Sequence, residues 1–167
     1  MDEYAQSFCE RWRQKGVCLG ITRIGAHAGP AIVGNFGGDR FFDYTAYGGT
    51  INVASRLEAA NKQFGTRILV SVALAERVEN FNGRPVGDLV LRGRTESIRA
   101  MEPFQLKPCD RPSALSYQKA FALLEAADRG AMAAFAVHVG NYPADQLAGF
   151  HLKRLLSGAS GTKIILD

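Results

Sequence analysis

The chain has 167 residues, of which 47% are hydrophobic and 22% are charged. This length corresponds to about one domain, and the composition is that of an ordinary globular protein, which argues against global disorder. The formal net charge of +4 is too mild and too evenly spread to indicate a nucleic-acid-binding protein, although it suits a small polyanionic ligand.

Neither a membrane segment nor a cysteine-based metal site is predicted. No apolar run approaches the roughly 20 residues that a membrane-spanning helix needs. The N-terminal residues lack the basic and apolar regions of a signal peptide, so we expect a cytoplasmic protein. The three cysteines, at positions 9, 18 and 109, match no zinc-binding spacing.

The first half of the chain reads as a helix followed by strands. A helix is predicted over residues 2–15, because aromatic side chains recur at every fourth position. Apolar residues then alternate with polar or small ones over 17–21, which predicts a strand. The glycine-rich run 25–38 is predicted to hold a turn between two strands, and an aromatic strand spans 40–47.

A glycine corner then leads into the most informative helix. Gly48-Gly49 breaks the strand, and Thr50 is expected to cap a helix over 50–64. At about 100° per residue, Asn52 and Arg56 share one face of this helix. An amide beside a guanidinium favours a site for a phosphorylated ligand, and the alternative is an ordinary solvated helix face.

The second half divides at a change of composition. Residues 67–71 read as a buried strand and 81–106 as further β structure. A proline-containing linker is predicted at 108–112, between a first unit over 1–107 and a helical unit over 113–167. The helical unit carries two apolar stripes, Tyr117, Ala120, Phe121 and Leu124, then Ala131, Ala134, Phe135 and His138.

Two segments resemble the class III nucleotidyl cyclases, in the right order and at the right separation. Residues 25–30, Gly-Ala-His-Ala-Gly-Pro, are similar to the family's Gly-Ile-His-Thr-Gly-Pro segment. Residues 44–58 are similar to its Tyr-Thr-x-x-Gly-x-Thr-Val-Asn-x-Ala-x-Arg-Leu-Glu segment, and 68–71 to the strand that follows. The resemblance covers roughly residues 4–106. It implies an α+β, ferredoxin-like nucleotidyl cyclase fold, incomplete at the N-terminus and followed by a small all-helical appendix.

The resemblance also implies a reaction and a set of roles. Family members pair two catalytic domains head to tail, so a homodimer or a second cyclase domain is expected as partner. The ribose 3′-hydroxyl of a nucleoside triphosphate attacks the α-phosphorus and releases pyrophosphate. By resemblance, Asn52 would position the ribose region and Arg56 would stabilise charge on the triphosphate. Thr45 lies where the family reads the purine, and a threonine there favours ATP over GTP.

The metal half of such a site is not recognised in the sequence. The family holds Mg²⁺ or Mn²⁺ with two aspartates that precede the first predicted helix, and nothing in residues 1–16 matches those segments. We therefore expect an adenylate cyclase half-site that is inactive by itself, with no metal ligand of its own. The alternative is a catalytically inactive cyclase-like regulatory or dimerisation module.

Overall fold

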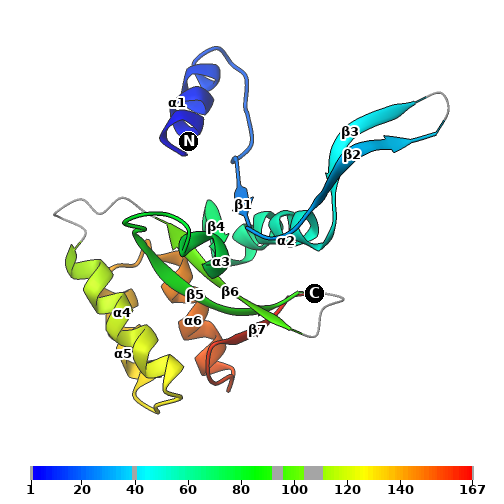
Figure 1. The fold of residues 1–167 in the computed structure, drawn as a ribbon. Helices are drawn as coiled ribbons and strands as arrows, with labels where there is room; N and C mark the ends of the chain where they lie inside the picture. Colours follow the sequence, from blue (N-terminus) through cyan, green and yellow to red (C-terminus); the bar gives the residue numbers. More distant parts are fainter. Residues whose placement is uncertain (1, 39–40, 92–95, 104–110, 167) are drawn as a thin grey trace.

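The computed structural model describes residues 2–38, 41–91, 96–103 and 111–166 (Figure 1). In chain order the elements are α1 (Asp2–Arg13), β1 (Ile24–Ala26), β2 (Ile32–Gly37), β3 (Phe42–Tyr47), α2 (Gly49–Phe64), β4 (Ile68–Ser71), α3 (Val72–Ala75), β5 (Gly83–Val90), β6 (Ser97–Pro103), α4 (Arg111–Glu125), α5 (Ala131–Asn141), α6 (Gln146–Leu156) and β7 (Lys163–Ile165). The predicted α+β class is confirmed. None of the helices in these ranges is both long and apolar enough to cross a bilayer.

The main sheet has five strands in the order β1-β4-β6-β5-β7. The two edge strands run parallel to their neighbours, and the inner pairs are antiparallel. Strand β5 pairs with β6 from Gly83 opposite Pro103 to Val90 opposite Ser97, with a bulge between Pro85 and Gly87. Strands β2 and β3 form a separate antiparallel hairpin.

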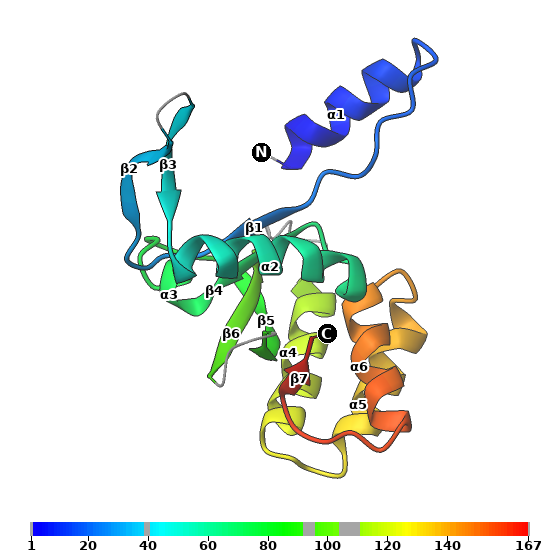
Figure 2. The same cartoon turned by 90° about the vertical axis from the view of Figure 1, so that its right-hand side faces the viewer.

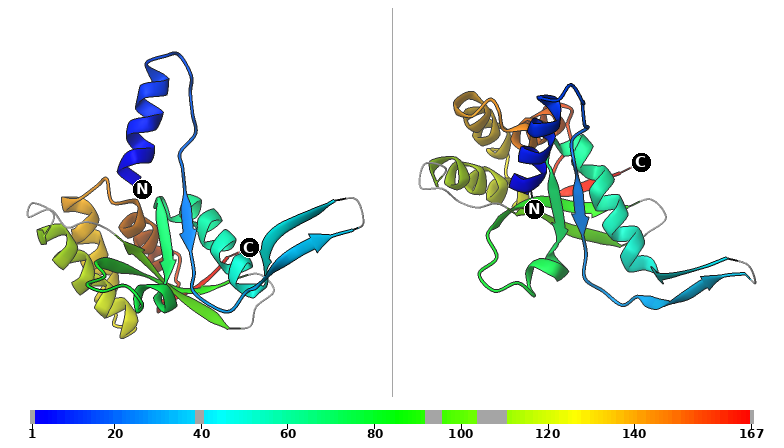
Figure 3. Two further views of the ribbon diagram at one scale, coloured as in Figure 1. Left: turned by 45° about the horizontal axis from the view of Figure 1, so that its top comes forward. Right: turned by 90° about the horizontal axis from the view of Figure 1, so that it is seen from above.

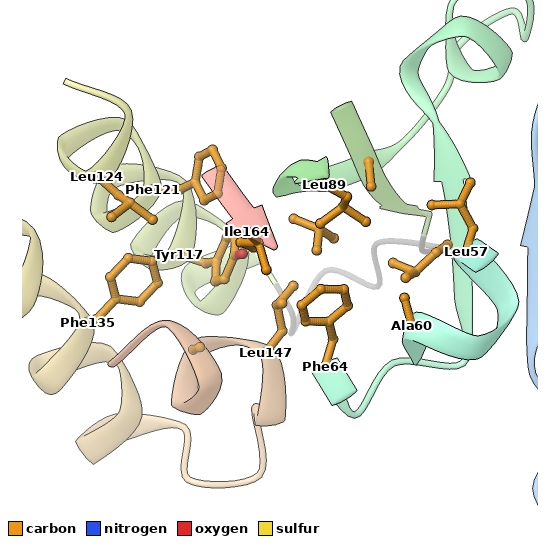
Figure 4. Close-up of a cluster of buried hydrophobic side chains, with 14 of the residues drawn as sticks. Leu57, Ala60, Phe64, Leu89, Tyr117, Phe121, Leu124, Phe135, Leu147 and Ile164 are labelled. Atoms are coloured by element: carbon orange, nitrogen blue, oxygen red, sulfur yellow. The ribbon is translucent and has the colours of Figure 1, made fainter. Parts of the chain in front are cut away.

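One hydrophobic core joins the sheet to α2 and to the C-terminal helices α4, α5 and α6 (Figure 4). Leu57 and Phe64 of α2, Leu89 of β5, Tyr117 of α4 and Leu147 of α6 are almost completely buried in the same cluster. Burying a side chain of this size contributes about 1.5–3 kcal/mol. The first apolar stripe predicted in the C-terminal part is buried throughout, which confirms that α4 turns it toward this core.

The C-terminal part contains the predicted helices and, in addition, a strand. Lys163–Ile165 form β7, which pairs with Asp88–Val90 of β5 at the edge of the sheet. Residues 108–110 of the predicted linker lie outside the described part of the chain. Arg111 and Pro112 begin α4, where proline is tolerated because the first helical N–H groups have no partner within the helix.

Two segments project from this body. Helix α1 and the β2–β3 hairpin both extend away from the sheet, as the views in Figures 1, 2 and 3 agree. The strand predicted over residues 17–21 is wrong: the chain there has no regular structure, and β1 begins only at Ile24. On this side β4 pairs through Ile68–Val70, and these three residues pair with Ile24–Ala26. Within the described part of the chain, residues 17–21 therefore have no strand beside them to pair with.

Candidate functional site

Helix α2 presents two faces of opposite character. Val53, Leu57 and Phe64 are buried in the core. Asn52 is exposed and Arg56 is half-buried, four residues further along the helix. Side chains at this spacing lie about 5–6 Å apart at Cβ. The helix therefore brings the predicted amide and guanidinium together and holds them away from the core, as the sequence indicated.

The start of α2 is held by a contact different from the predicted one. Thr50 does not cap the helix: the cap residue is Gly48, at φ +135°, and it has no side chain to offer. Instead, the Thr50 hydroxyl donates a hydrogen bond to the carbonyl oxygen of Pro30 at 2.5 Å. This bond joins the two segments that carry the family resemblance, which lie next to each other in the fold.

Strand β1 approaches α2 as closely as a backbone can. A Cβ atom added at Gly25 would collide with the backbone of Ala54 and Glu58. These two residues flank Arg56 in the helix. Only glycine allows this separation, because it has no side chain at all. Gly25 therefore sets the position of the helix segment that carries the candidate site.

We expect Gly25→Ala to lower the free energy of unfolding by about 1–3 kcal/mol, because the added methyl group pushes β1 from α2. Urea denaturation followed by circular dichroism measures the change. Gly20→Ala is the matched control, since a Cβ at Gly20 has no neighbour within 4 Å. Equal midpoints for the two variants would contradict the close approach.

His27 is engaged in holding the same corner. Its Nδ1 atom lies 2.7 Å from the Ser71 hydroxyl, and that hydroxyl oxygen accepts a bond from the Leu74 amide at 3.3 Å. The arrangement ties the turn after β1 to the start of α3. It supports a structural role for His27.

Thr45 lies on a different element from Asn52 and Arg56. It is exposed on β3, opposite Gly34 in the hairpin register. The hairpin leaves the body near the start of α2 (Figure 2). The exposed large apolar residues between positions 32 and 47 are Ile32, Val33, Phe41, Phe42, Tyr44 and Tyr47. The described chain thus offers the candidate base-reading residue on an arm and the candidate phosphate-binding residues on a core helix.

A buried charged cluster, which the sequence did not reveal, lies between the sheet and the C-terminal helices. Burial alone would raise the pKa of Asp145, but hydrogen bonds from Arg84 and its positive charge hold that pKa below its usual range. Burial raises the pKa of Glu102, and Arg84 offsets this only in part. Asp145 is 61 residues from Arg84, and no local pattern marks the pair.

Metal-ligating side chains do not gather in the described ranges. There, no group of three or more His, Cys, Asp or Glu residues could hold a metal ion. The exposed side of α2 offers the hydrogen-bonding amide of Asn52 and the positive charge of Arg56. Both groups suit the oxygen atoms of a phosphorylated ligand.

Comparisons with known proteins agree on one family. Residues 3–108 match the family described as the adenylate and guanylate cyclase catalytic domain. Adenylate cyclase 1 of Rhizobium meliloti (strain 1021) is 37% identical over 103 residues, and an adenylate cyclase of Anabaena cylindrica is 34% identical over 101. These matches cover 61% and 56% of this chain but only 16% and 20% of the relatives.

A solved structure shares the fold. The adenylyl cyclase CyaB from P. aeruginosa superposes with a TM-score of 0.52 at 27% sequence identity. The alignment covers 64% of this chain and 55% of that one. Thr45, Asn52 and Arg56 all lie within residues 3–108, the part of the chain that matches the family.

Proposed function

The chain belongs to the adenylate and guanylate cyclase catalytic domain family, and from this premise we propose that it supplies one half of an adenylate cyclase active site. The substrate is ATP, and the products are cyclic AMP and pyrophosphate. The other half comes from a second cyclase domain that carries the metal-binding aspartates. The relatives named above carry adenylate cyclase in their names, which favours ATP over GTP.

The observation that carries the proposal is the solvent-facing side of α2. Asn52 and Arg56 lie there together, on a helix whose opposite face is buried and whose start is fixed by the Thr50–Pro30 bond. A support of this kind favours positioning of a ligand, because the backbone that carries the two side chains loses little freedom when the ligand binds.

The proposed chemistry is an intramolecular displacement at phosphorus. The ribose 3′-oxygen forms a bond to the α-phosphorus, the bond from the α-phosphorus to the bridging oxygen breaks and pyrophosphate leaves, and the 3′-hydroxyl proton passes to water. Asn52 holds the ribose near the line of attack by donating and accepting hydrogen bonds. Arg56 donates to the phosphate oxygens on which negative charge grows. Thr45 contacts the purine from the hairpin.

Mg²⁺ or Mn²⁺ serves the complete enzyme in this proposal, and it would bind outside the elements just discussed. The residues that the structure describes do not fit such an ion, since they form no suitable ligand group. The roles of Asn52 and Arg56 do not pass through a metal ion.

We expect the chain by itself to form no cyclic AMP from ATP with either Mg²⁺ or Mn²⁺. Mixing it with a cyclase domain that retains the metal-binding aspartates, but lacks its own asparagine and arginine, is expected to produce cyclic AMP. Chromatography of the nucleotides measures both, with GTP as the competing substrate.

Each outcome of that experiment is decisive for one part of the proposal. Cyclic AMP from the chain alone would contradict the half-site assignment. No product from the mixture would favour a regulatory or dimerisation module without catalysis. Faster conversion of GTP than of ATP would overturn the role given to Thr45.

A further inference from the structure

Arg84 is the centre of a buried charged cluster that joins β5 to the C-terminal helices. Its Nε atom donates to Glu102 of β6 at 2.7 Å. Its two terminal nitrogens donate to the two carboxylate oxygens of Asp145, Nη2 to Oδ1 at 3.0 Å. The guanidinium carbon lies 4.4 Å from the ring centre of Tyr117 in α4. The side chains of Arg84 and Asp145 are only 17% and 10% exposed, so this is an interior ion pair.

Asp145 passes this attachment on to both α5 and α6. It is the cap residue of α6, where its Oδ1 atom accepts a hydrogen bond from the Ala148 amide at 3.1 Å. Its Oδ2 atom lies 3.0 Å from Nε2 of His138, a fully buried residue of α5. One carboxylate therefore fixes the corner between the two helices onto strand β5.

Helix α6 in turn abuts the end of α2 (Figure 2). The rings of Phe64 and Phe150 meet edge to face, with their centres 4.9 Å apart. Gly65, which ends α2 at φ +68°, lies so close to the Gln146 side chain that a Cβ atom has no space there. On the solvent side the two helices border a cleft of about 580 Å³, lined among others by Lys62 and Lys153. These contacts join α6 to the last residues of α2 and to Gly65.

We propose that the Arg84–Asp145 ion pair holds α6 against the end of α2. The C-terminal helices thereby position α2, the helix that carries Asn52 and Arg56. The chain of contacts is continuous. It runs from β5 through the Asp145 corner into α6, and from Phe150 and Gln146 into the last turn of α2. The importance of this helix for catalysis rests on the proposed function, but the mechanical coupling does not.

The test is amide hydrogen exchange of the whole chain, followed residue by residue. Asp145→Asn is the main variant, because asparagine still caps a helix but lacks the charge that Arg84 binds. We expect exchange to rise at least tenfold in α6. It should rise as much at the amide of Thr66, which follows the end of α2 and bonds to the carbonyl oxygen of Asn61 in its last turn at 3.1 Å. Amides at the pairing of β1 with β4 are expected to keep their wild-type rates.

The matched control is Glu125→Gln, which removes an exposed ion pair between α4 and Arg99 of β6. It is expected to change neither α6 nor α2. Faster exchange in α6 with an unchanged last turn of α2 would overturn the coupling. If exchange rose uniformly over all elements in Asp145→Asn, the Arg84–Asp145 pair would only contribute to the stability of the whole chain. That result would also overturn the proposal.

A second variant covers the case in which Asp145→Asn does not fold. Phe150→Leu removes the ring that meets Phe64 while leaving the ion pair in place. Faster exchange at Thr66 with unchanged exchange in α5 is expected, and an unchanged rate at Thr66 would contradict the proposal. Because the measurement needs no nucleotide, its failure is distinct from a failure of the proposed function, which appears as unaltered turnover in the Arg56 variant discussed below.

Discussion

Replacing Arg56 with alanine is expected to lower kcat for cyclic AMP formation by a factor of about 10² or more, the usual cost of losing one preorganised donor to a developing charge. The side chain is placed for this by α2, whose buried face fixes the helix against the sheet. Since the charge on the phosphate oxygens grows in the transition state, kcat is expected to fall more than KM rises. Turnover is measured in the complemented mixture described above.

Lys62→Ala is the matched control for this experiment. Lys62 is also a cation on α2, but it lies in the last turn, away from Asn52. Its removal is expected to leave kcat within about twofold, because an exposed charge at that distance is screened by solvent. A loss of turnover in the Lys62 variant as large as in the Arg56 variant, or none in either, would sink the assignment.

Replacing Arg84 with methionine is expected to destabilise the chain by about 3–5 kcal/mol near neutral pH, because two carboxylates are left in the interior without their cation. Asp145 and Glu102 both bind the guanidinium, and both side chains are less than one fifth exposed. Methionine keeps most of the volume, so the loss reports the charge. Urea denaturation measures it.

The destabilisation caused by this variant is expected to become smaller as the pH falls. In the wild type the pKa of Asp145 is lowered, so its ionised form stabilises the fold, and this contribution is lost as the pH falls through that lowered value. Without Arg84, burial raises the pKa of both carboxyl groups, so protonation of these groups makes the variant more stable. The loss of unfolding free energy relative to the wild type is therefore expected to be smaller at about pH 4 than at about pH 7.

Two neighbours must be counted in that experiment. Burial, aided by the charge of Arg154, lowers the pKa of His151 to about 3, so this residue stays neutral over the range. The other neighbour is His138, whose Nε2 atom lies 3.0 Å from Oδ2 of Asp145. Arg99→Met is the control, because Arg99 pairs with Glu125 at the surface, and about 1 kcal/mol or less is expected. A deficit of equal size at both pH values would contradict the argument.

The sequence by itself determined the local elements and the candidate site on α2. The 3.6-residue period places Asn52 and Arg56 together on one side of α2, and the buried Val53, Leu57 and Phe64 recur with the same period. Ile51, which the apolar pattern grouped with Leu57, is exposed. Gly65 ends the helix as predicted, in the left-handed conformation. The family resemblance, read from residues 25–30 and 44–58, is confirmed by the match over residues 3–108.

Short-range patterns failed where pairing or capping depends on a distant residue. Residues 17–21 alternate like a strand, yet a strand needs a neighbour to bond with, and on this edge of the sheet β4 pairs with Ile24–Ala26 but not with residues 17–21. Thr50 is a good cap by type, but its hydroxyl finds Pro30, 20 residues away. Both outcomes are decided by which segments the fold brings side by side.

Only the tertiary structure decided how the C-terminal helices relate to the rest. The sequence treats residues 113–167 as an appendix, whereas the fold adds β7 to the sheet and places Tyr117 and Leu147 in the common core. The Arg84–Asp145 pair depends on a separation of 61 residues that no periodicity encodes. Helical and strand periods report a few neighbouring residues, but burial of an ion pair requires two surfaces to meet, and only the folded chain fixes which surfaces those are.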